Sequence, residues 1–191
     1  MSKIKLYGSY TSPYVRHIRI ALKQLGLEYD FVEADYEYSD ANSPCKRVPF
    51  LEHGGKMFTD SSSILLYLRQ LKGDAAFVDV DDFELYTMAN TTMDAEINLF
   101  LLERDGLRPE TVPYLARQRQ RVESSLARLD KIMTISSRQN DGLTDGEIRL
   151  VCLLDWADFR NRFEVNSYTN LSEFLANARC MEMFVQTKPP A

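Results

Sequence analysis

The stretch TSPYVR at residues 11–16 decides the start of the first helix and, through it, the fold of the N-terminal third. Ser12 is a favoured N-cap residue, and Pro13 suits the first helical position because no N–H donor is needed there. Apolar residues then recur at helical spacing as far as Leu25. The sequence therefore predicts a helix that begins after Ser12 and ends before Gly26.

Short strands flank this helix on both sides. Residues 3–7 alternate polar and apolar side chains, and residues 29–33 form a second run of strand formers. A strand, a helix and a strand in this order favour a parallel pair joined by a right-handed crossover. Residues 50–52 and 56–58 are two further strands, because the glycine pair between them is a hairpin signal.

A second helix completes this part of the chain. Asp60 and Ser61 are capping residues, apolar side chains follow at helical spacing, and Gly73 marks the end. Residues 34–47 are polar and irregular, so we expect a turn or a short helix there. The predicted order is βαβ, an irregular segment, ββ and α.

The rest of the chain has the periodicity of helices rather than of strands. Thr144 and Glu147 have the spacing of a capping box ahead of an apolar run. A cluster of aspartates in residues 74–82 marks the linker. We therefore predict an α/β domain at residues 1–75 and an all-helical domain at residues 83–191. The expected helices of the second domain are 83–102, 113–133, 144–159 and 171–185.

Composition excludes several classes of protein. The 191 residues carry a net charge of −5, so no nucleic-acid partner is expected. No apolar run is long enough to span a membrane, and the first residues lack the apolar block of a signal peptide. Three widely spaced cysteines argue against a disulfide framework and for a reducing compartment, so we expect a cytoplasmic location. Two histidines without a CxxC motif predict no metal site.

Three motifs together resemble the glutathione S-transferase family. They are SPYVR at residues 12–16, RVPFL at residues 47–51 and DSSSILLYL at residues 60–68. The capping box at Thr144, ahead of a buried helix, is a fourth match. The resemblance covers nearly the whole chain and implies a thioredoxin-like βαβ–ββα domain followed by a helical-bundle domain. The chain resembles small bacterial members, with a serine/threonine-like active-site motif.

The resemblance implies that the chain binds glutathione and stabilises its thiolate. A thiol is mostly protonated at neutral pH, whereas a helix N-terminus and a hydroxyl donor both favour the charged sulfur. By resemblance, Ser12 is the first choice for this hydroxyl and Thr11 the second. Tyr10 is the third choice and Tyr7 a distant option. A capping serine needs no catalytic role, so the helix cap alone is the other explanation of Ser12.

The resemblance also implies where the peptide binds. Val48 and Pro49 match the family's cis-proline turn, in which the Val48 backbone would pair with the cysteinyl unit like one rung of an antiparallel ladder. Ser61 would meet the γ-glutamyl carboxylate at a helix N-terminus, and the Asp60 carboxylate would meet the γ-glutamyl amine.

The glycyl carboxylate has three cationic candidates, Arg47, Lys46 and His53, and surface solvation is the alternative role of each. Three positions depart from the family pattern. Lys46 stands where many relatives have glycine, and Ser62 stands where proline or another residue is common. Gly146 lies in a helical first turn where relatives prefer a small non-glycine residue.

The resemblance leaves three functions open. The first is a transferase that conjugates glutathione to a small apolar electrophile, as in detoxification. The second is glutathione-dependent reduction of a disulfide or a peroxide, and the third is a non-catalytic interaction protein on the same scaffold. Relatives are usually two-fold homodimers, so we expect a second copy of the chain as partner.

Overall fold

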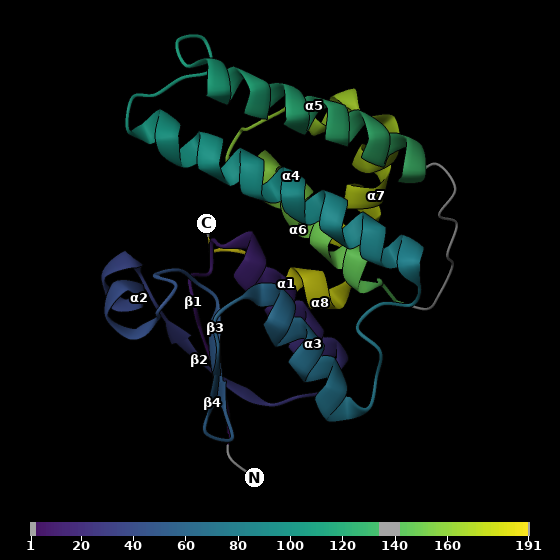
Figure 1. The fold of residues 1–191 in the computed structure, drawn as a ribbon. Coiled ribbons are helices and arrows are strands. Elements are labelled where there is room, and N and C mark those ends of the chain that lie inside the picture. The colour runs from purple at the N-terminus through teal and green to yellow at the C-terminus, as the bar shows by residue number, and fades with distance from the viewer. Residues whose placement is uncertain (1–2, 134–141, 191) are drawn as a thin grey trace. The chain divides into compact units, whose positions relative to one another are not determined.

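A computed structural model describes residues 3–133 and 142–190 (Figure 1). It has the predicted fold class: a four-stranded sheet with helices, followed by helices alone. The first elements are β1 (Ile4–Gly8), α1 (Pro13–Gln24), β2 (Tyr29–Glu33), α2 (Tyr36–Asn42), β3 (Phe50–His53), β4 (Lys56–Phe58) and α3 (Ser61–Lys72). The later elements are α4 (Val80–Arg104), α5 (Pro113–Met133), α6 (Asp145–Phe159), the 3₁₀ turn η1 (Val165–Ser167), α7 (Thr169–Arg179) and α8 (Glu182–Val185).

Contacts between residues divide the chain into two compact units. One contains the residues up to Val78 together with those from Arg179 onward, and the other contains Asp79–Ala178. The last segment, expected from the sequence in the helical domain, belongs to the first unit, where α8 packs on α1. The single helix expected over residues 171–185 is interrupted, because α7 ends at Arg179 and α8 begins only at Glu182.

The sheet of the first unit has the strand order β2-β1-β3-β4, with β1 parallel to β2 and antiparallel to β3. In this unit α1 and α3 pack side by side on one face of the sheet, and α2 lies on the other (Figure 1). On the α2 face, Tyr7 stacks on Phe50 at a centroid distance of 4.4 Å, and Ala34 joins them in a small core. Successive side chains of a strand point to opposite faces, so the fully buried Leu6 belongs to the α1 and α3 side.

The first turn of α1 lies directly against the end of β1 because Gly8 has no side chain. A Cβ atom built at Gly8 would lie 2.5 Å from a methyl carbon of Val15, which is closer than atoms pack. A larger residue would therefore push the helix away from the strand. Because Gly8 lacks a side chain, the start of α1, including Ser12, can lie close to the C-terminal end of β1.

The second unit is built around α6, in which every residue from Asp145 to Ala157 is buried. α6 packs against α4, which also contacts α5. Arg162, just beyond α6, makes two ion pairs with α4, to Glu96 and to Glu103, each at 2.7 Å. Among the described residues, none of the helices combines the length and the apolarity that crossing a bilayer requires.

Candidate functional site

Ser12 caps α1, as predicted, and its side chain is only loosely engaged. Its Oγ accepts a hydrogen bond from the Val15 N–H at 3.4 Å. A hydroxyl has both a proton to donate and lone pairs to accept with, so capping uses the oxygen and leaves the proton for another acceptor. The first turn of α1, residues 13–16, has no acidic residue that would neutralise the positive end of the helix dipole.

The loop before α1 holds the other hydroxyl candidates in different ways. Thr11 Oγ1 lies 3.1 Å from Ser9 Oγ, and the Thr11 N–H donates to the same Ser9 oxygen at 3.3 Å. Ser9, which no sequence pattern marks as a site residue, therefore positions Thr11. The Tyr10 ring instead packs on Phe31 at 4.6 Å and beneath the Arg19 guanidinium at 4.9 Å. Tyr10 is thus part of the packing between α1 and β2.

Tyr7, the distant option, is committed to a carboxylate. Its hydroxyl donates a hydrogen bond to Glu52 Oε2 at 2.9 Å. Burial, and then this hydrogen bond, raises the pKa of Tyr7 to about 12. A phenol whose proton is already held by a carboxylate does not offer that proton to sulfur. The structure gives no support to Tyr7 as the partner of a thiolate.

Val48 and Pro49 lead directly into β3. The peptide bond between them is cis, as the family resemblance implied. Pro49 is buried, and Val48 is half-buried against the small core of Tyr7 and Phe50 on the α2 face of the sheet. The segment is therefore anchored by packing on one side of β3.

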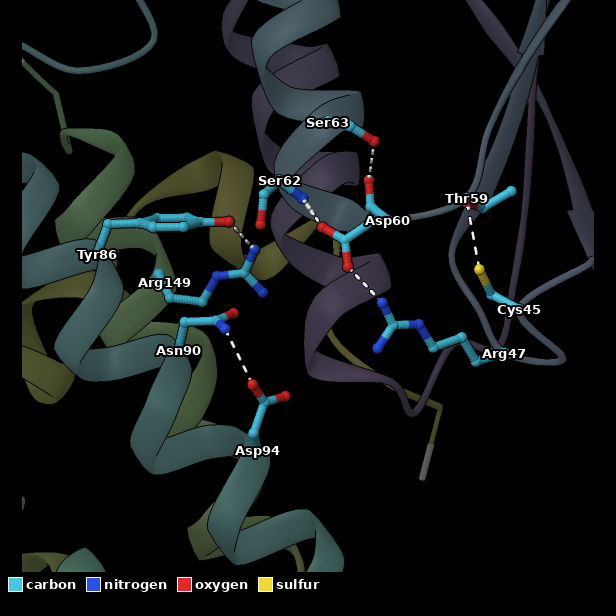
Figure 2. Close-up of polar contacts among 10 residues, drawn as sticks. All are labelled: Cys45, Arg47, Thr59, Asp60, Ser62, Ser63, Tyr86, Asn90, Asp94 and Arg149. Atoms are coloured by element: carbon cyan, nitrogen blue, oxygen red, sulfur yellow. Dashed lines mark hydrogen bonds and ion pairs between the residues drawn. The ribbon is translucent and has the colours of Figure 1, made fainter.

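Asp60 caps α3, and its carboxylate is shared between the helix and a neighbouring loop (Figure 2). Oδ1 accepts from the Ser62 N–H at 2.8 Å, and Oδ2 accepts from Arg47 Nη2 at 2.5 Å. Ser61 is the first residue of the helix and is buried. A carboxylate beside a helix N-terminus suits a ligand that carries both an ammonium and a carboxylate group.

The loop that follows α2 reaches the start of α3 at two points (Figure 2). The Cys45 thiol donates to Thr59 Oγ1 at 3.4 Å, and Arg47 pairs with Asp60. Between these contacts Lys46 has a left-handed backbone, with φ of 51°. Glycine adopts this conformation without a steric cost, whereas a residue with a Cβ atom adopts it less readily.

The other two cationic candidates are paired away from Asp60. Lys46 Nζ lies 3.5 Å from Asp40 Oδ2, and His53 Nδ1 lies 2.7 Å from the Tyr67 hydroxyl of α3. The structure therefore brings only Arg47, of the three, to the start of α3. Within residues 3–133 and 142–190, no group of three or more His, Cys, Asp and Glu side chains could hold a metal ion.

The register of the sheet brings the three motifs to one edge. Tyr7 pairs with Phe50, so the loop after β1 and the residues before β3 lie at the same end of the antiparallel pair. Leu51 pairs with Phe58, so β4 also ends there, just before the start of α3. Two helix N-termini and the Val48 backbone therefore meet at one edge of the sheet. Each helix start and the strand entry offer polar groups to a small anionic peptide.

Comparisons with known proteins agree with this geometry. The family model described as "Glutathione S-transferase, N-terminal domain" matches residues 6–76. The uncharacterized GST-like protein YibF of Escherichia coli is 26% identical over 204 residues, which cover 98% of this chain and 99% of that protein. Glutathione S-transferase U3 of Arabidopsis thaliana is 38% identical over 73 residues, which cover 35% of this chain and 32% of that protein.

Solved structures share the fold over nearly the full length of the chain. A glutathione S-transferase of Methylobacterium radiotolerans, in complex with glutathione sulfonate, has a TM-score of 0.84 at 23% identity, covering 99% of this chain and 96% of that one. A glutathione S-transferase of Methylobacillus flagellatus with GSH bound has a TM-score of 0.85 at 24% identity, covering 98% and 100%. At these identities the likeness shows the fold.

Proposed function

The chain belongs to the glutathione S-transferase family, and from this premise we propose that it binds glutathione and transfers it to a small apolar electrophile. The observation that carries the proposal is the meeting of Ser12, Val48-Pro49 and Asp60 at one edge of the sheet. Two of the solved structures with this fold are complexes with GSH or glutathione sulfonate, which supports the same ligand here.

Ser12 is the proposed catalytic hydroxyl. Its O–H donates a hydrogen bond to the thiolate sulfur of glutathione while its oxygen caps α1, so the two roles do not compete. The positive end of the α1 dipole acts in the same direction. Both effects favour the charged sulfur, and each unit by which the pKa of the thiol falls corresponds to about 1.4 kcal/mol. Thr11, held by Ser9, is the second proposed donor.

Four further residues hold the peptide in this proposal. Ser61 at the start of α3 binds the γ-glutamyl carboxylate, and Asp60 binds the γ-glutamyl amine. Val48, held in place by Pro49, pairs with the backbone of the cysteinyl unit. The gain for catalysis is proximity, since the sulfur is held where the electrophile can meet it.

The proposal is tested by titrating glutathione calorimetrically and by following its conjugation to an aryl chloride. Binding at millimolar or lower concentration with measurable conjugation is the expected result. Binding without conjugation, combined with reduction of a model disulfide, would favour the reductase function. Ser12 stands where a reductase would need a cysteine, so glutathione would then have to supply the thiol. No binding at millimolar glutathione would leave the non-catalytic interaction protein.

The proposed assembly is a two-fold homodimer in the cytoplasm. In the first unit, Met57 on β4 and Leu66 on α3 are 42% and 45% exposed, and a second copy would bury such side chains. Sedimentation equilibrium measures the oligomeric state directly. A mass of one chain at micromolar concentration would contradict this part of the proposal.

A further inference from the structure

The family resemblance makes Arg47 one of three candidates for the glycyl carboxylate. In the structure Arg47 instead binds Asp60, the residue proposed for the γ-glutamyl amine, at 2.5 Å (Figure 2). Arg47, a candidate for the glycyl carboxylate, and Asp60, proposed for the γ-glutamyl amine, are therefore paired with one another.

The direction of the proposed backbone pairing places the main chain of Arg47 beside the glycine of the ligand. In an antiparallel rung the residue before Val48 lies opposite the residue after the ligand's cysteine. That residue is Arg47 on the protein and glycine on the peptide. The side chain of Arg47 therefore has two acceptors within the site, Asp60 when the ligand is absent and the glycyl carboxylate when it is bound.

The pair between Arg47 and Asp60 is weak enough to be exchanged. The two side chains are 58% and 42% exposed, and solvent-exposed ion pairs contribute little stability. The Asp60 carboxylate does not depend on the pair for its position, because its other oxygen accepts the Ser62 N–H at 2.8 Å. Arg47 can leave without displacing the cap of α3.

We propose that Arg47 is a specificity-determining residue that exchanges carboxylates, neutralising Asp60 in the free protein and moving to the glycyl carboxylate when the peptide binds. This inference rests on the proposed function. The exchange frees the Asp60 charge for the γ-glutamyl amine at the moment when the other end of the peptide is engaged. A γ-glutamyl compound without the C-terminal carboxylate has to compete with Arg47 for Asp60. The site therefore selects peptides that carry charges at both ends.

The test compares glutathione with its glycyl ethyl ester, which lacks the charge at that end, in calorimetric titrations of wild type and Arg47→Gln. Arg47→Gln should bind glutathione about tenfold more weakly, because a charge-assisted hydrogen bond is lost. It should bind the ester about two- to fivefold more tightly, because Asp60 is no longer neutralised. Opposite signs for the two ligands are the signature of exchange, since a merely structural role would weaken both.

Two variants serve as controls. In an Asp60→Asn background, Arg47→Gln should no longer improve binding of the ester, because the competing carboxylate is gone. Lys72→Gln removes the same charge from the far end of α3 and should leave the affinity for both ligands nearly unchanged, because distant exposed charges are screened.

Three results would overturn the inference. If Arg47→Gln weakens both ligands, or leaves the ester unchanged, while wild type binds glutathione, the exchange is wrong and the proposed function stands. If the gain for the ester persists without the Asp60 charge, the exchange is likewise wrong. If wild type binds no glutathione, the proposed function fails and the inference with it.

Discussion

The starts of α1 and α6 are both capped by a hydroxyl side chain, and they differ in how completely that side chain is used. Thr144 Oγ1 accepts the Glu147 N–H at 3.2 Å, the Glu147 carboxylate accepts the Thr144 N–H at 2.8 Å, and the Thr144 hydroxyl donates to Asp82. Ser12 makes one long cap bond, to the Val15 N–H at 3.4 Å. The Thr144 hydroxyl at the start of α6 therefore both donates and accepts a hydrogen bond within the protein, whereas the Ser12 hydroxyl at the start of α1 only accepts one.

The difference extends to charge. Asp145 and Glu147 lie in the first turn of α6, and Asp82 from α4 accepts its Gly146 N–H at 3.0 Å. These carboxylates neutralise the positive end of the α6 dipole inside the fold. The first turn of α1 carries no carboxylate. A hydroxyl cap is therefore structural where acidic groups complete it, and suited to an anionic ligand where they are missing.

The largest effect is expected from Ser12, because its hydroxyl, unlike that of Thr144, is left to act in catalysis rather than only in stabilising a helix. Ser12→Gly removes the hydroxyl but keeps most of the cap energy, whereas Ser12→Ala removes both. Both variants should lose about 10- to 100-fold in kcat/KM for aryl conjugation, because a hydrogen bond to a charged sulfur is lost. Only Ser12→Ala should also lower the free energy of unfolding, by about 1 kcal/mol. Ser12→Thr, which keeps a hydroxyl, is the matched control. Full activity in Ser12→Gly would mean that Ser12 only caps α1 and takes no part in conjugation.

Asp82→Ala should act on stability alone. The side chain accepts from the Thr144 hydroxyl and from the Gly146 N–H, and its removal leaves these donors without that acceptor. We expect the free energy of unfolding to fall by about 1–3 kcal/mol. The measurement is urea denaturation, and Asp81→Ala, an exposed neighbour in the same turn, is the control. If both variants unfold at the same urea concentration, the start of α6 is not held by α4.

Gly146→Ala should destabilise the same junction by crowding it. A Cβ atom at this position would lie 2.6 Å from the backbone oxygen of Asp82 and 2.6 Å from its carboxylate. Overpacking of this kind costs about 1–3 kcal/mol, which thermal denaturation detects. The double variant with Asp82→Ala should not recover, because the backbone oxygen remains.

The Tyr7 hydroxyl, like that of Thr144, already donates to a carboxylate of the protein. Tyr7 therefore tests whether such a hydroxyl contributes to stability and not to conjugation. Its folded-state pKa of about 12 lies above the ordinary value of 10.0, so the folded protein holds the proton more tightly. The resulting stabilisation is complete below pH 10 and declines as the pH rises towards 12. Tyr7→Phe should flatten this alkaline decline and leave conjugation in place. Urea denaturation at pH values from below 10 upward towards 12 measures the first effect. A loss of conjugation would make Tyr7 a candidate for the sulfur.

The smallest effect is expected at Lys46, in the loop that contacts the start of α3. Lys46→Gly should raise the free energy of unfolding by up to about 1 kcal/mol, because glycine removes the steric cost of the left-handed backbone. Part of this gain is offset, because glycine also raises the conformational entropy of the unfolded chain. Lys46→Ala removes the same side chain without that freedom and should show no gain. Thermal denaturation compares the two variants, and equal midpoints would contradict the expected role of the backbone.

Local signals in the sequence were enough to predict most helix boundaries. Ser12 caps α1, Thr144 caps α6 within a capping box, and α5 spans Pro113–Met133 as expected. Such signals are reliable because caps and apolar repeats act on residues within one or two turns of themselves. The family motifs also pointed to Asp60 and Val48.

The partners of these residues were not predictable in the same way. Glu52 binds Tyr7 from 45 positions away, and Asp82 binds Thr144 from 62 positions away. Neither carboxylate belongs to a local motif. Ser9, which lies only two residues from Thr11, was missed because a serine in a loop has no distinguishing pattern.

The sequence by itself determined most helix starts, the order of the main strands and helices, and the family resemblance, because these depend on neighbouring residues along the chain. Only the tertiary structure decided where the last segment packs and which carboxylate Arg47 binds. In the first unit, Arg16 binds the Phe184 carbonyl at 3.0 Å, and Arg19 binds the Thr187 carbonyl at 3.0 Å. A guanidinium donates to whichever acceptor the fold brings within reach, and no spacing in the sequence encodes that distance.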